Sequence, residues 1–390
     1  MPPLSHDVTY IGRTNHHNQG KLFGIKQADR LHHMYIIGKT GVGKSTLIEF
    51  MARQDLLMGR GFAVIDPHGD MAESLHAFAE KYRPGKTVYF DAADMSQPYG
   101  YNPLRRVRFD KIPLAVSGLM GALQKQWPDA WGVRMEHVLR NSLYALLEQP
   151  AATLPDILRL YSDEKFRKKV TKGLRNKVVQ RFWQTEFEAY PDRLKSEAVA
   201  PIQNKLGAIL TDPRLYRILV SPQTDIRFRL MMDTGGALIV NLAKGRLGED
   251  STNVLGGLIV STIGLAALSR AESTASNRRP FFLYVDEFQT FTTLAFVNMM
   301  AELRKYGVGV VFAHQHLHQL EPDVRHATLG NVGSVISFRI GAEDADLISK
   351  EFQSALNSAD FTDLTLGAVY LHILIDGWKC RCFSAKSCDF

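Results

Sequence analysis

Short runs of consecutive apolar residues recur along this chain and predict the strands of a buried sheet. Most runs are apolar at successive positions, so both faces of each strand would be covered, which is typical of a parallel sheet between layers of helices. Helical patterns between several of the runs favour an α/β domain. The predicted strands are residues 34–37, 62–65, 87–90, 237–240, 281–285, 308–313, 334–340 and 368–374.

The segment between about residues 105 and 230 has a different pattern. Helical spacing repeats there, turn signals separate the helices, and no convincing strand occurs. We therefore predict an all-helical domain inserted between two strands of the sheet. The predicted boundaries are 1–30 for an N-terminal arm or short strand, 31–105 and 231–390 for the discontinuous α/β domain, and 106–230 for the insertion.

The strongest chemical signal is the stretch MYIIGKTGVGKSTLIEF at residues 34–50. An apolar strand leads into the spacing G-x-x-x-x-G-K-S, and a helical pattern follows, which is the context that a phosphate-binding loop requires. Backbone N–H groups and the helix N-terminus would hold phosphate, while Lys44 would reach the β- and γ-phosphates and Ser45 would bind Mg²⁺. The predicted nucleotide-binding residues are Gly38, Lys39, Thr40, Gly41, Val42, Gly43, Lys44, Ser45 and Thr46.

A second signal is FFLYVDEFQTF at residues 281–291, where an apolar strand ends in two carboxylates. A phosphate loop needs a metal partner and a group that orients water, both at the carboxyl end of a neighbouring strand. Asp286 suits the Mg²⁺ role and Glu287 suits polarisation of the attacking water. The pairing with the phosphate loop favours hydrolysis over binding alone. Because no guanine-reading Asn-Lys-x-Asp motif occurs, ATP is preferred to GTP.

A third signal is ELRKYGVGVVFAHQ at residues 302–315, where a helix gives way to a strand. Gln315 follows the apolar run and would lie beside the γ-phosphate, where it could distinguish triphosphate from diphosphate. Arg304 precedes the strand and could project into a neighbouring subunit's site to stabilise charge on the transferring phosphoryl group. For a single arginine, an exposed surface charge is the alternative.

Other polar residues near the strand ends leave alternatives open. Asp66 and His68 follow the second strand beside the phosphate loop, as nucleotide-site residues or as ordinary loop residues. Lys244 and Arg246 lie in a loop after a strand and could face a channel or a neighbouring subunit. The alternating histidines at residues 314–318 could suggest a metal site, although the pattern alone does not favour one.

The composition favours a folded cytoplasmic protein. The chain has 390 residues, of which 45% are apolar, so it can build sizeable cores. Its three cysteines all fall in the last eleven residues, which is not a disulfide framework and favours a reducing compartment. No secretory signal is visible, and the longest apolar stretch, Val254 to Leu268, is too short to span a bilayer and predicts a buried helix.

The net charge of +7 is concentrated in residues 165–181, which contain eight Lys or Arg and no Asp or Glu. Apolar residues recur every fourth position from Phe166 to Phe182, through Leu174 and Val178, and predict one basic amphipathic helix despite Gly173. The segment could be a solvated face, an anionic-membrane surface or a nucleic-acid contact. The candidate DNA-binding residues are Lys168, Lys169, Lys172 and Arg175.

The chain resembles the FtsK–HerA superfamily of hexameric DNA-pumping ATPases. Four elements carry the resemblance: the phosphate loop, the DPHGD segment from Asp66 to Asp70, VDEFQ, and the R-x10-Q spacing from Arg304 to Gln315. The helical insertion and the run RKYGVGVVFAHQHLHQL are most similar to conjugative type IV coupling proteins of the TraD kind. The similarity spans about residues 20–105 and 230–375 and implies a RecA-like P-loop motor domain.

The resemblance also assigns roles and partners. It implies phosphate and Mg²⁺ binding by Lys44 and Ser45, metal and water positioning by Asp286 and Glu287, an arginine finger at Arg304 and a sensor at Gln315. It further implies a homo-hexameric ring with ATP between subunits and DNA, single- or double-stranded, in the central channel. The implied function is an ATP-driven DNA translocase of conjugative transfer, with a relaxase or secretion-system proteins as candidate partners.

The chain departs from these families at its N-terminus. Typical coupling proteins carry amino-terminal membrane helices and HerA-type proteins carry a barrel, whereas 37 residues precede Gly38 here. We therefore expect a soluble minimal motor without a transmembrane segment, which reaches the inner membrane only through partners. The alternatives are a HerA-like DNA-processing ATPase, a nucleotide-dependent adaptor for a relaxase or nuclease, and an ATPase that moves protein.

Overall fold

The computed structural model describes residues 5–15, 20–353 and 355–388, and it divides into two compact units. We call the first the sheet unit; it comprises Met1–Asp91, Phe228–Gly245 and Ala266–Phe390. We call the second the helical unit; it comprises Ala92–Arg227 and Arg246–Leu265. Residues 1–4 and 16–19 of the expected N-terminal arm lie outside the described residues.

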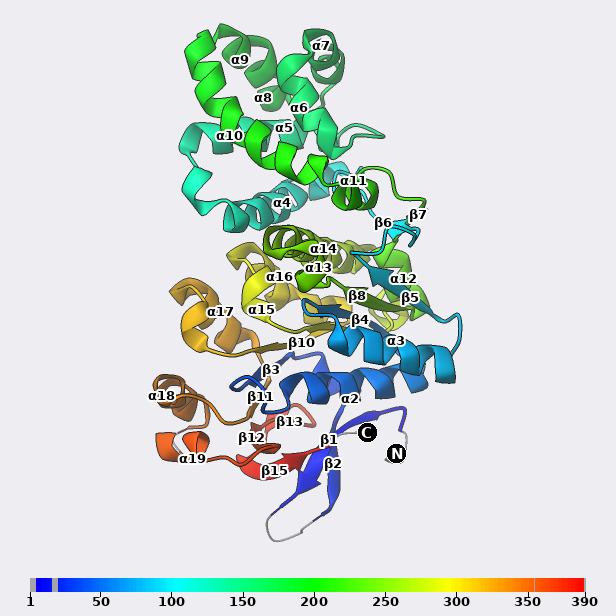
Figure 1. Ribbon diagram of the computed structural model, residues 1–390, viewed down its shortest axis with the longest axis vertical. Helices are drawn as coiled ribbons and strands as arrows, with labels where there is room; N and C mark the ends of the chain where they lie inside the picture. Colours follow the sequence, from blue (N-terminus) through cyan, green and yellow to red (C-terminus); the bar gives the residue numbers. More distant parts are fainter. Residues whose placement is uncertain (1–4, 16–19, 354, 389–390) are drawn as a thin grey trace. The chain divides into compact units, whose positions relative to one another are not determined.

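The sheet unit is built on one 11-stranded sheet (Figure 1). From edge to edge its strands are β2 (Leu22–Lys26), β1 (Val8–Thr14), β15 (Phe383–Ser387), β12 (Ala368–His372), β11 (Ser334–Ser337), β3 (Met34–Ile37), β10 (Val308–His314), β9 (Phe281–Val285), β4 (Gly61–Asp66), β8 (Ala237–Asn241) and β5 (Thr87–Asp91). Neighbours from β11 to β5 pair in parallel, which confirms the predicted fold class. The strands from β2 to β12 extend the sheet by antiparallel pairing.

Helices cover both faces of the parallel strands, as their continuous apolar sequences require. On one face, α2 (Lys44–Leu57) and α3 (Asp70–Tyr82) bury residues such as Leu47 and Leu75 with Ile36 and Val64 of the strands (Figure 1). On the other face, Phe288 of α15 (Phe288–Phe291) stacks on the ring of β10 residue Phe312, with 4.3 Å between centroids. The helix α16 (Leu294–Leu303) adds Phe296 to the same aromatic cluster.

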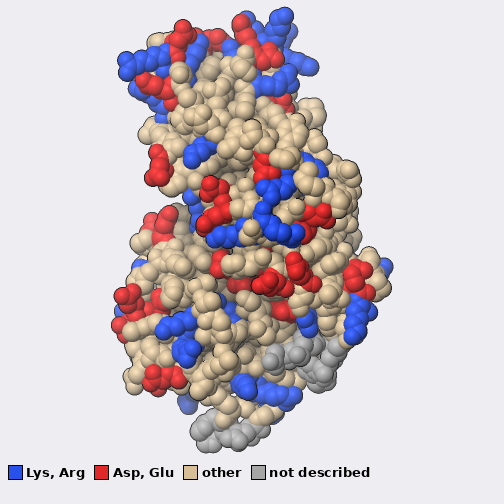
Figure 2. Space-filling model, in the orientation of Figure 1, with Lys and Arg blue, Asp and Glu red and all other residues tan. Residues whose placement is uncertain are grey.

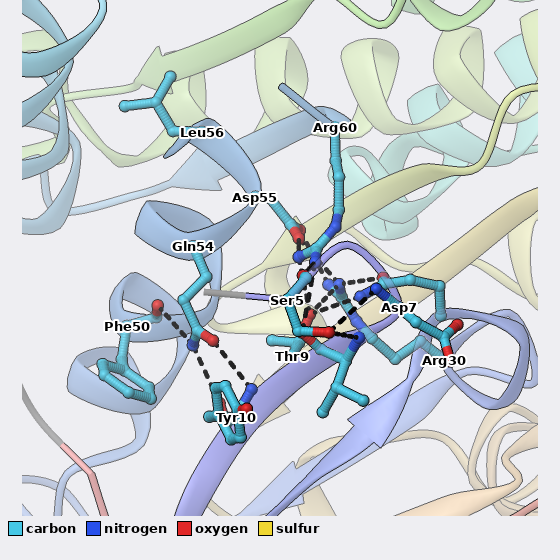
Figure 3. A network of polar contacts seen from close by, with 12 residues as sticks. Ser5, Asp7, Thr9, Tyr10, Arg30, Phe50, Gln54, Asp55, Leu56 and Arg60 are labelled. Atoms are coloured by element: carbon cyan, nitrogen blue, oxygen red, sulfur yellow. Dashed lines mark hydrogen bonds and ion pairs between the residues drawn. The ribbon is translucent and has the colours of Figure 1, made fainter. Parts of the chain in front are cut away.

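A buried ionic network fastens the amino-terminal strands to the sheet (Figure 3). Arg30, at the end of α1 (Gln27–Arg30), donates two hydrogen bonds of 2.9 Å to the carboxylate of Asp55, and both side chains are fully buried. Arg60 and the hydroxyl of Tyr284 also donate to Asp55, at 2.9 and 2.6 Å. Thr9 of β1 accepts from both arginines. Within the expected arm, Val8–Thr14 and Leu22–Lys26 thus form two sheet strands anchored to α2 and β9.

The helical unit contains mainly α-helices. They are α4 (Ile112–Gln126), α5 (Val133–Leu147), α6 (Leu154–Ser162), α7 (Glu164–Lys172), α8 (Lys177–Arg181), α9 (Phe187–Ala189), α10 (Asp192–Thr211), α11 (Pro213–Leu219) and most of α14 (Glu249–Ser269). The prediction that no strand interrupts residues 106–230 is wrong in one detail. The two-residue strand β7 (Thr224–Asp225) pairs with β6 (Tyr99–Gly100), which closes a small parallel ladder.

The prediction that residues 165–181 form a single basic helix is also wrong. The segment is divided between α7 and α8. Gly173 ends α7, and the side chain of Asn176 accepts hydrogen bonds from the first backbone N–H groups of α8. The carboxylate of Glu148 stabilises the turn between α7 and α8 by accepting hydrogen bonds from the backbone N–H groups of Arg175 and Asn176, at 2.7 and 3.2 Å. The break shifts the apolar stripe, so that Val178 is 70% exposed and Val179 is buried.

One segment in the described part of the chain, Glu249–Glu272, is long and apolar enough to cross a membrane. Of its most apolar window, 72% is buried inside the protein. This burial agrees with the sequence-based expectation of a buried helix, because core helices of folded domains have the same length and composition.

Candidate nucleotide site

The phosphate loop lies between β3 and α2, as its motif predicts. Gly41 and Gly43 have φ angles of 75° and 112°, in the left-handed region that glycine adopts without strain. A Cβ atom at Gly38 would lie 2.6 Å from Cβ of Phe338, so that position also excludes a side chain. Lys44 Nζ donates to the carbonyl oxygens of Gly38 and Lys39 at 2.7 and 2.9 Å, folding its ammonium group back over the loop.

The loop is joined to the end of β9 by its serine. Ser45 Oγ donates to Oδ2 of Asp286 at 2.5 Å, and the N–H of Glu287 donates to Oδ1 at 2.9 Å. Burial raises the pKa of Asp286, although both hydrogen bonds oppose the shift. Burial likewise lowers the pKa of Lys44, against the attraction of the two carboxylates. A bound divalent cation would favour ionised Asp286, and hydroxyl and carboxylate oxygens are the ligands that Mg²⁺ prefers.

Glu287 is held at the carboxyl end of β9 by two neighbours. Its Oε1 lies 2.9 Å from Nε2 of His68 and accepts a hydrogen bond from the side-chain amide of Gln315 at 3.2 Å. Gln315 in turn accepts a bond of 2.9 Å from the hydroxyl of Thr40 in the phosphate loop. The backbone of Glu287 has φ of 48°, a left-handed conformation that costs a non-glycine residue about 1–2 kcal/mol and is frequent at functional sites.

The segment DPHGD places His68 in this cluster. The carboxylate of Asp66 accepts hydrogen bonds from the backbone N–H groups of His68 and Ala72, at 3.0 and 2.9 Å, and these bonds fix the turn between β4 and α3. Burial alone would lower the pKa of His68, but the hydrogen bond with Glu287 and the nearby carboxylate charges outweigh it and raise that pKa. Asp66 and His68 were candidates from the sequence, and the structure brings His68 to the carboxylate of Glu287.

Arg304 does not lie at the phosphate loop of its own chain. It is exposed in the turn η6 (Arg304–Tyr306), directly before the amino end of β10. Burial and the charge of Arg304 together lower the pKa of His32, which precedes β3, whereas the phosphate loop follows that strand. Arg304 and the loop therefore lie at opposite ends of parallel strands.

The alternating histidines do not converge. His314 is buried beside the hydroxyl of Tyr35, His316 lies 3.2 Å from Asp344, and His318 lies 3.5 Å from Glu343. Within residues 5–15, 20–353 and 355–388, no three His, Cys, Asp or Glu side chains form a group that could hold a metal ion.

Three of the four predicted DNA contacts, Lys168, Lys172 and Arg175, line two hollows of the helical unit, and Lys169 lines neither. Lys168 and Lys172 line a cavity of about 350 Å³ beside Trp183. Arg175 lines a second cavity of about 440 Å³ and covers the ring of Phe109 at 4.1 Å. Lys168 also forms an ion pair of 2.5 Å with Glu164. On the face shown in Figure 2, acidic side chains are interspersed among the basic ones around α7 and α9.

Comparison with known proteins identifies relatives for most of the chain. The family model described as the central domain of helicase HerA matches residues 26–263, and that of the TraM recognition site of TraD and TraG matches residues 280–355. The type 4 coupling protein DotL of Legionella pneumophila is 21% identical over 434 residues, covering 95% of this chain and 53% of DotL. The chain thus spans about half the length of this curated relative.

Solved structures share the fold at low sequence identity. The unbound form of the bacterial conjugative coupling protein TrwBdeltaN70 superposes with a TM-score of 0.66 at 16% identity, covering 93% of this chain and 86% of the solved one. TrwB in complex with ADP and Mg²⁺ gives 0.66 at 17% identity, with 93% and 87% coverage. VirB4 of Thermoanaerobacter pseudethanolicus gives 0.66 at 14% identity, with 99% and 97% coverage.

The region matched by the HerA model contains the phosphate loop, and the region matched by the TraD and TraG model contains Asp286 and Glu287. The HerA model covers more than half of the chain, and the fold is that of the TrwB and VirB4 P-loop domains. The chain therefore belongs to the P-loop family of the HerA helicase central domain and is similar to type IV coupling proteins.

Proposed function

We propose that this protein is an ATP-driven DNA translocase of the type IV coupling kind, active as a homo-hexameric ring. The observation that carries the proposal is the contact between Ser45 and Asp286, with Glu287 directly beside it. This contact brings the phosphate loop and the carboxylate pair to one place, although 241 positions of sequence separate the two residues.

Each side chain has a defined task in hydrolysis. Lys44 exchanges its bonds to loop carbonyls for bonds to the β- and γ-phosphates. Ser45 and Asp286 would hold Mg²⁺, which would neutralise charge on the phosphates. Glu287 orients and polarises the water that attacks the γ-phosphorus, so that a P–O bond forms to water as the bond to the ADP oxygen breaks. Gln315 contacts both the loop and Glu287, and therefore can report which nucleotide is bound.

Arg304 supports a shared site between subunits. Because it lies at the opposite end of the strands from its own phosphate loop, it can reach a nucleotide only in a neighbouring molecule. A guanidinium group supplied in trans stabilises charge on the transferring phosphoryl group. This role requires a closed ring in which each interface joins the loop of one subunit to Arg304 of the next.

The proposed partners are DNA, single- or double-stranded, and a relaxase or secretion-system proteins. Basic residues around the two hollows of the helical unit supply positive charge for phosphate contacts. DotL is named a type 4 coupling protein, and TrwB is described as a bacterial conjugative coupling protein. The conjugative description of TrwB favours DNA transfer over protein transport. The proposed location is the cytoplasm, with attachment to the inner membrane through partners.

Two other functions remain candidates. A HerA-like DNA-processing ATPase is favoured by the family model that covers residues 26–263. A nucleotide-dependent adaptor for a relaxase or nuclease would need the nucleotide site but no water-polarising group. The hydrogen-bonded position of Glu287 argues for turnover rather than for an adaptor.

The test is the ATPase rate without nucleic acid, with single-stranded DNA and with duplex DNA. We expect Mg²⁺-dependent hydrolysis that rises with DNA. Glu287→Gln should bind ATP but lose about 10²–10⁴-fold in turnover, the range that general-base groups contribute. Lys44→Ala should weaken ATP binding itself. Glu80→Gln, at an exposed position of α3, is the matched control and should behave as wild type.

The outcomes separate the candidate functions. Normal turnover by Glu287→Gln would refute the assignment of the water-orienting residue. ATP binding without hydrolysis under all three conditions would support the adaptor and refute the translocase.

A further inference from the structure

Four polar side chains form a chain across the carboxyl ends of four adjacent strands. The sheet order β3, β10, β9 and β4 is matched by Thr40, Gln315, Glu287 and His68, each located just after its strand. Successive members lie 2.9, 3.2 and 2.9 Å apart. Three of them have assigned roles in nucleotide binding or hydrolysis. His68, at the end of this series of hydrogen-bonded side chains, has no assigned role.

The bonds to Glu287 are unequal between its two oxygens. His68 and Gln315 both approach Oε1, whereas neither of these contacts involves Oε2. A carboxyl group rotates easily about its last side-chain torsion, because that torsion has a broad profile. Two donors on one oxygen restrict this rotation and direct the other oxygen away from them. Oε2 is then the atom available to accept a proton from water.

His68 can hold Glu287 because its own backbone is fixed. The hydrogen bond from its N–H group to Asp66 places it at the start of the turn after β4. Its side chain is 55% exposed, so it contributes little packing, while the side chain of Glu287 is only 17% exposed. Replacement of His68 should therefore change the orientation of Glu287 and leave the stability of the sheet unit nearly unchanged.

We infer that His68 is a positioning residue for hydrolysis, which holds Oε1 of Glu287 so that Oε2 faces the attacking water. The inference rests on the proposed ATPase function and assigns that site a residue beyond the phosphate loop, the β9 carboxylates, Arg304 and Gln315. In this role His68 acts through its contact with Glu287.

The test compares turnover and KM for ATP in three variants. His68→Ala removes the donor and should lower kcat by about 10- to 100-fold at unchanged KM, the scale of a misplaced reacting group. His68→Gln keeps an N–H donor of similar reach and should restore most of the loss. His326→Ala, at an exposed position of α17 (Pro322–Asn331), is the matched control and should match wild type. Thermal midpoints of all variants should agree within a few degrees.

Each other result overturns the inference. An unchanged kcat in His68→Ala, beside a collapsed Glu287→Gln, would refute the positioning role alone and leave the proposed function intact. A rise in kcat would mean that His68 restrains Glu287 in an unproductive orientation. A raised KM at constant kcat would indicate a role in ATP binding instead. If the wild-type protein hydrolyses no ATP, the proposed function is wrong and the inference falls with it.

Discussion

The replacement Asp55→Asn tests the buried ionic network that fastens the first strands to α2 and β9. Asp55 accepts hydrogen bonds from Arg30, Arg60 and Tyr284, and its side chain is fully buried. Asparagine has almost the same shape but no charge. The change therefore leaves the guanidinium of Arg30 buried without its counter-ion, while the packing around it stays nearly the same.

The expected loss is about 3–5 kcal/mol in the free energy of unfolding, the usual effect of removing one partner of a buried ion pair. Tyr284→Phe is the graded control, because it removes one donor to a charged acceptor and preserves the ion pair. It should cost about 1.5–3 kcal/mol. For domains of 150–250 residues, each kcal/mol corresponds to about 2–4 °C in thermal midpoint, so Asp55→Asn should lower it by about 6–20 °C.

The measurement is urea unfolding at several pH values, monitored by circular dichroism. Burial would raise the pKa of Asp55, but the charges of Arg30 and Arg60 and the hydrogen bonds outweigh it and lower that pKa. The stabilisation is therefore complete above the ordinary carboxyl pKa and is lost as pH falls through the lowered value. The difference between wild type and Asp55→Asn should be largest near neutral pH and should shrink in acid.

Two results would refute this reasoning. The first is a loss below about 1 kcal/mol in Asp55→Asn at neutral pH, which would place the pair in the range of surface ion pairs. The second is additivity in a double-mutant cycle with Arg30→Met. A buried pair predicts strong coupling, because removing both charges eliminates the uncompensated one.

Two further predictions concern the proposed assembly and its DNA contacts. Mixing Arg304→Ala subunits with Glu287→Gln subunits should restore some ATPase activity, because a mixed interface can contain one intact site; rings that mix without recovery would contradict a shared site. Neutralising the four basic candidates should weaken DNA binding about equally for all sequences and reduce the slope of log affinity against log salt by about 0.7–0.9 per lost contact. These candidates are Lys168, Lys169, Lys172 and Arg175. Unchanged affinity and slope would instead direct attention to Lys244 and Arg246.

The local pattern of the chain was sufficient for the phosphate loop and for most strands of the sheet. Continuous apolar runs mark strands covered on both faces. The glycine spacing reflects a close approach of Phe338 at Gly38 and a left-handed backbone at Gly43. Asp286 and Glu287 were recognisable because they end such a run. In each case the determinants lie within a few residues of the feature they specify.

The basic segment at residues 165–181 shows where local pattern failed. Apolar residues at every fourth position predicted one helix, yet Asn176 caps a new helix. Glu148, which lies 27 and 28 positions before the two residues whose N–H groups it binds, stabilises the turn between the helices. Spacing records only which residues could share a face. It contains no information about a capping side chain and a distant carboxylate that together favour a turn.

Only the tertiary structure decided which residues from different strands lie together at the site. The sequence identified a nucleotide-binding loop, a carboxylate pair and candidates at other strand ends, because each is written in a short segment. The order of strands β3, β10, β9 and β4 is set by packing and by pairing between distant segments. That order brings His68 to Glu287 across 219 positions and separates Arg304 from its own phosphate loop. The physical reason is that parallel strands share their carboxyl ends, while the choice of neighbours depends on the whole core.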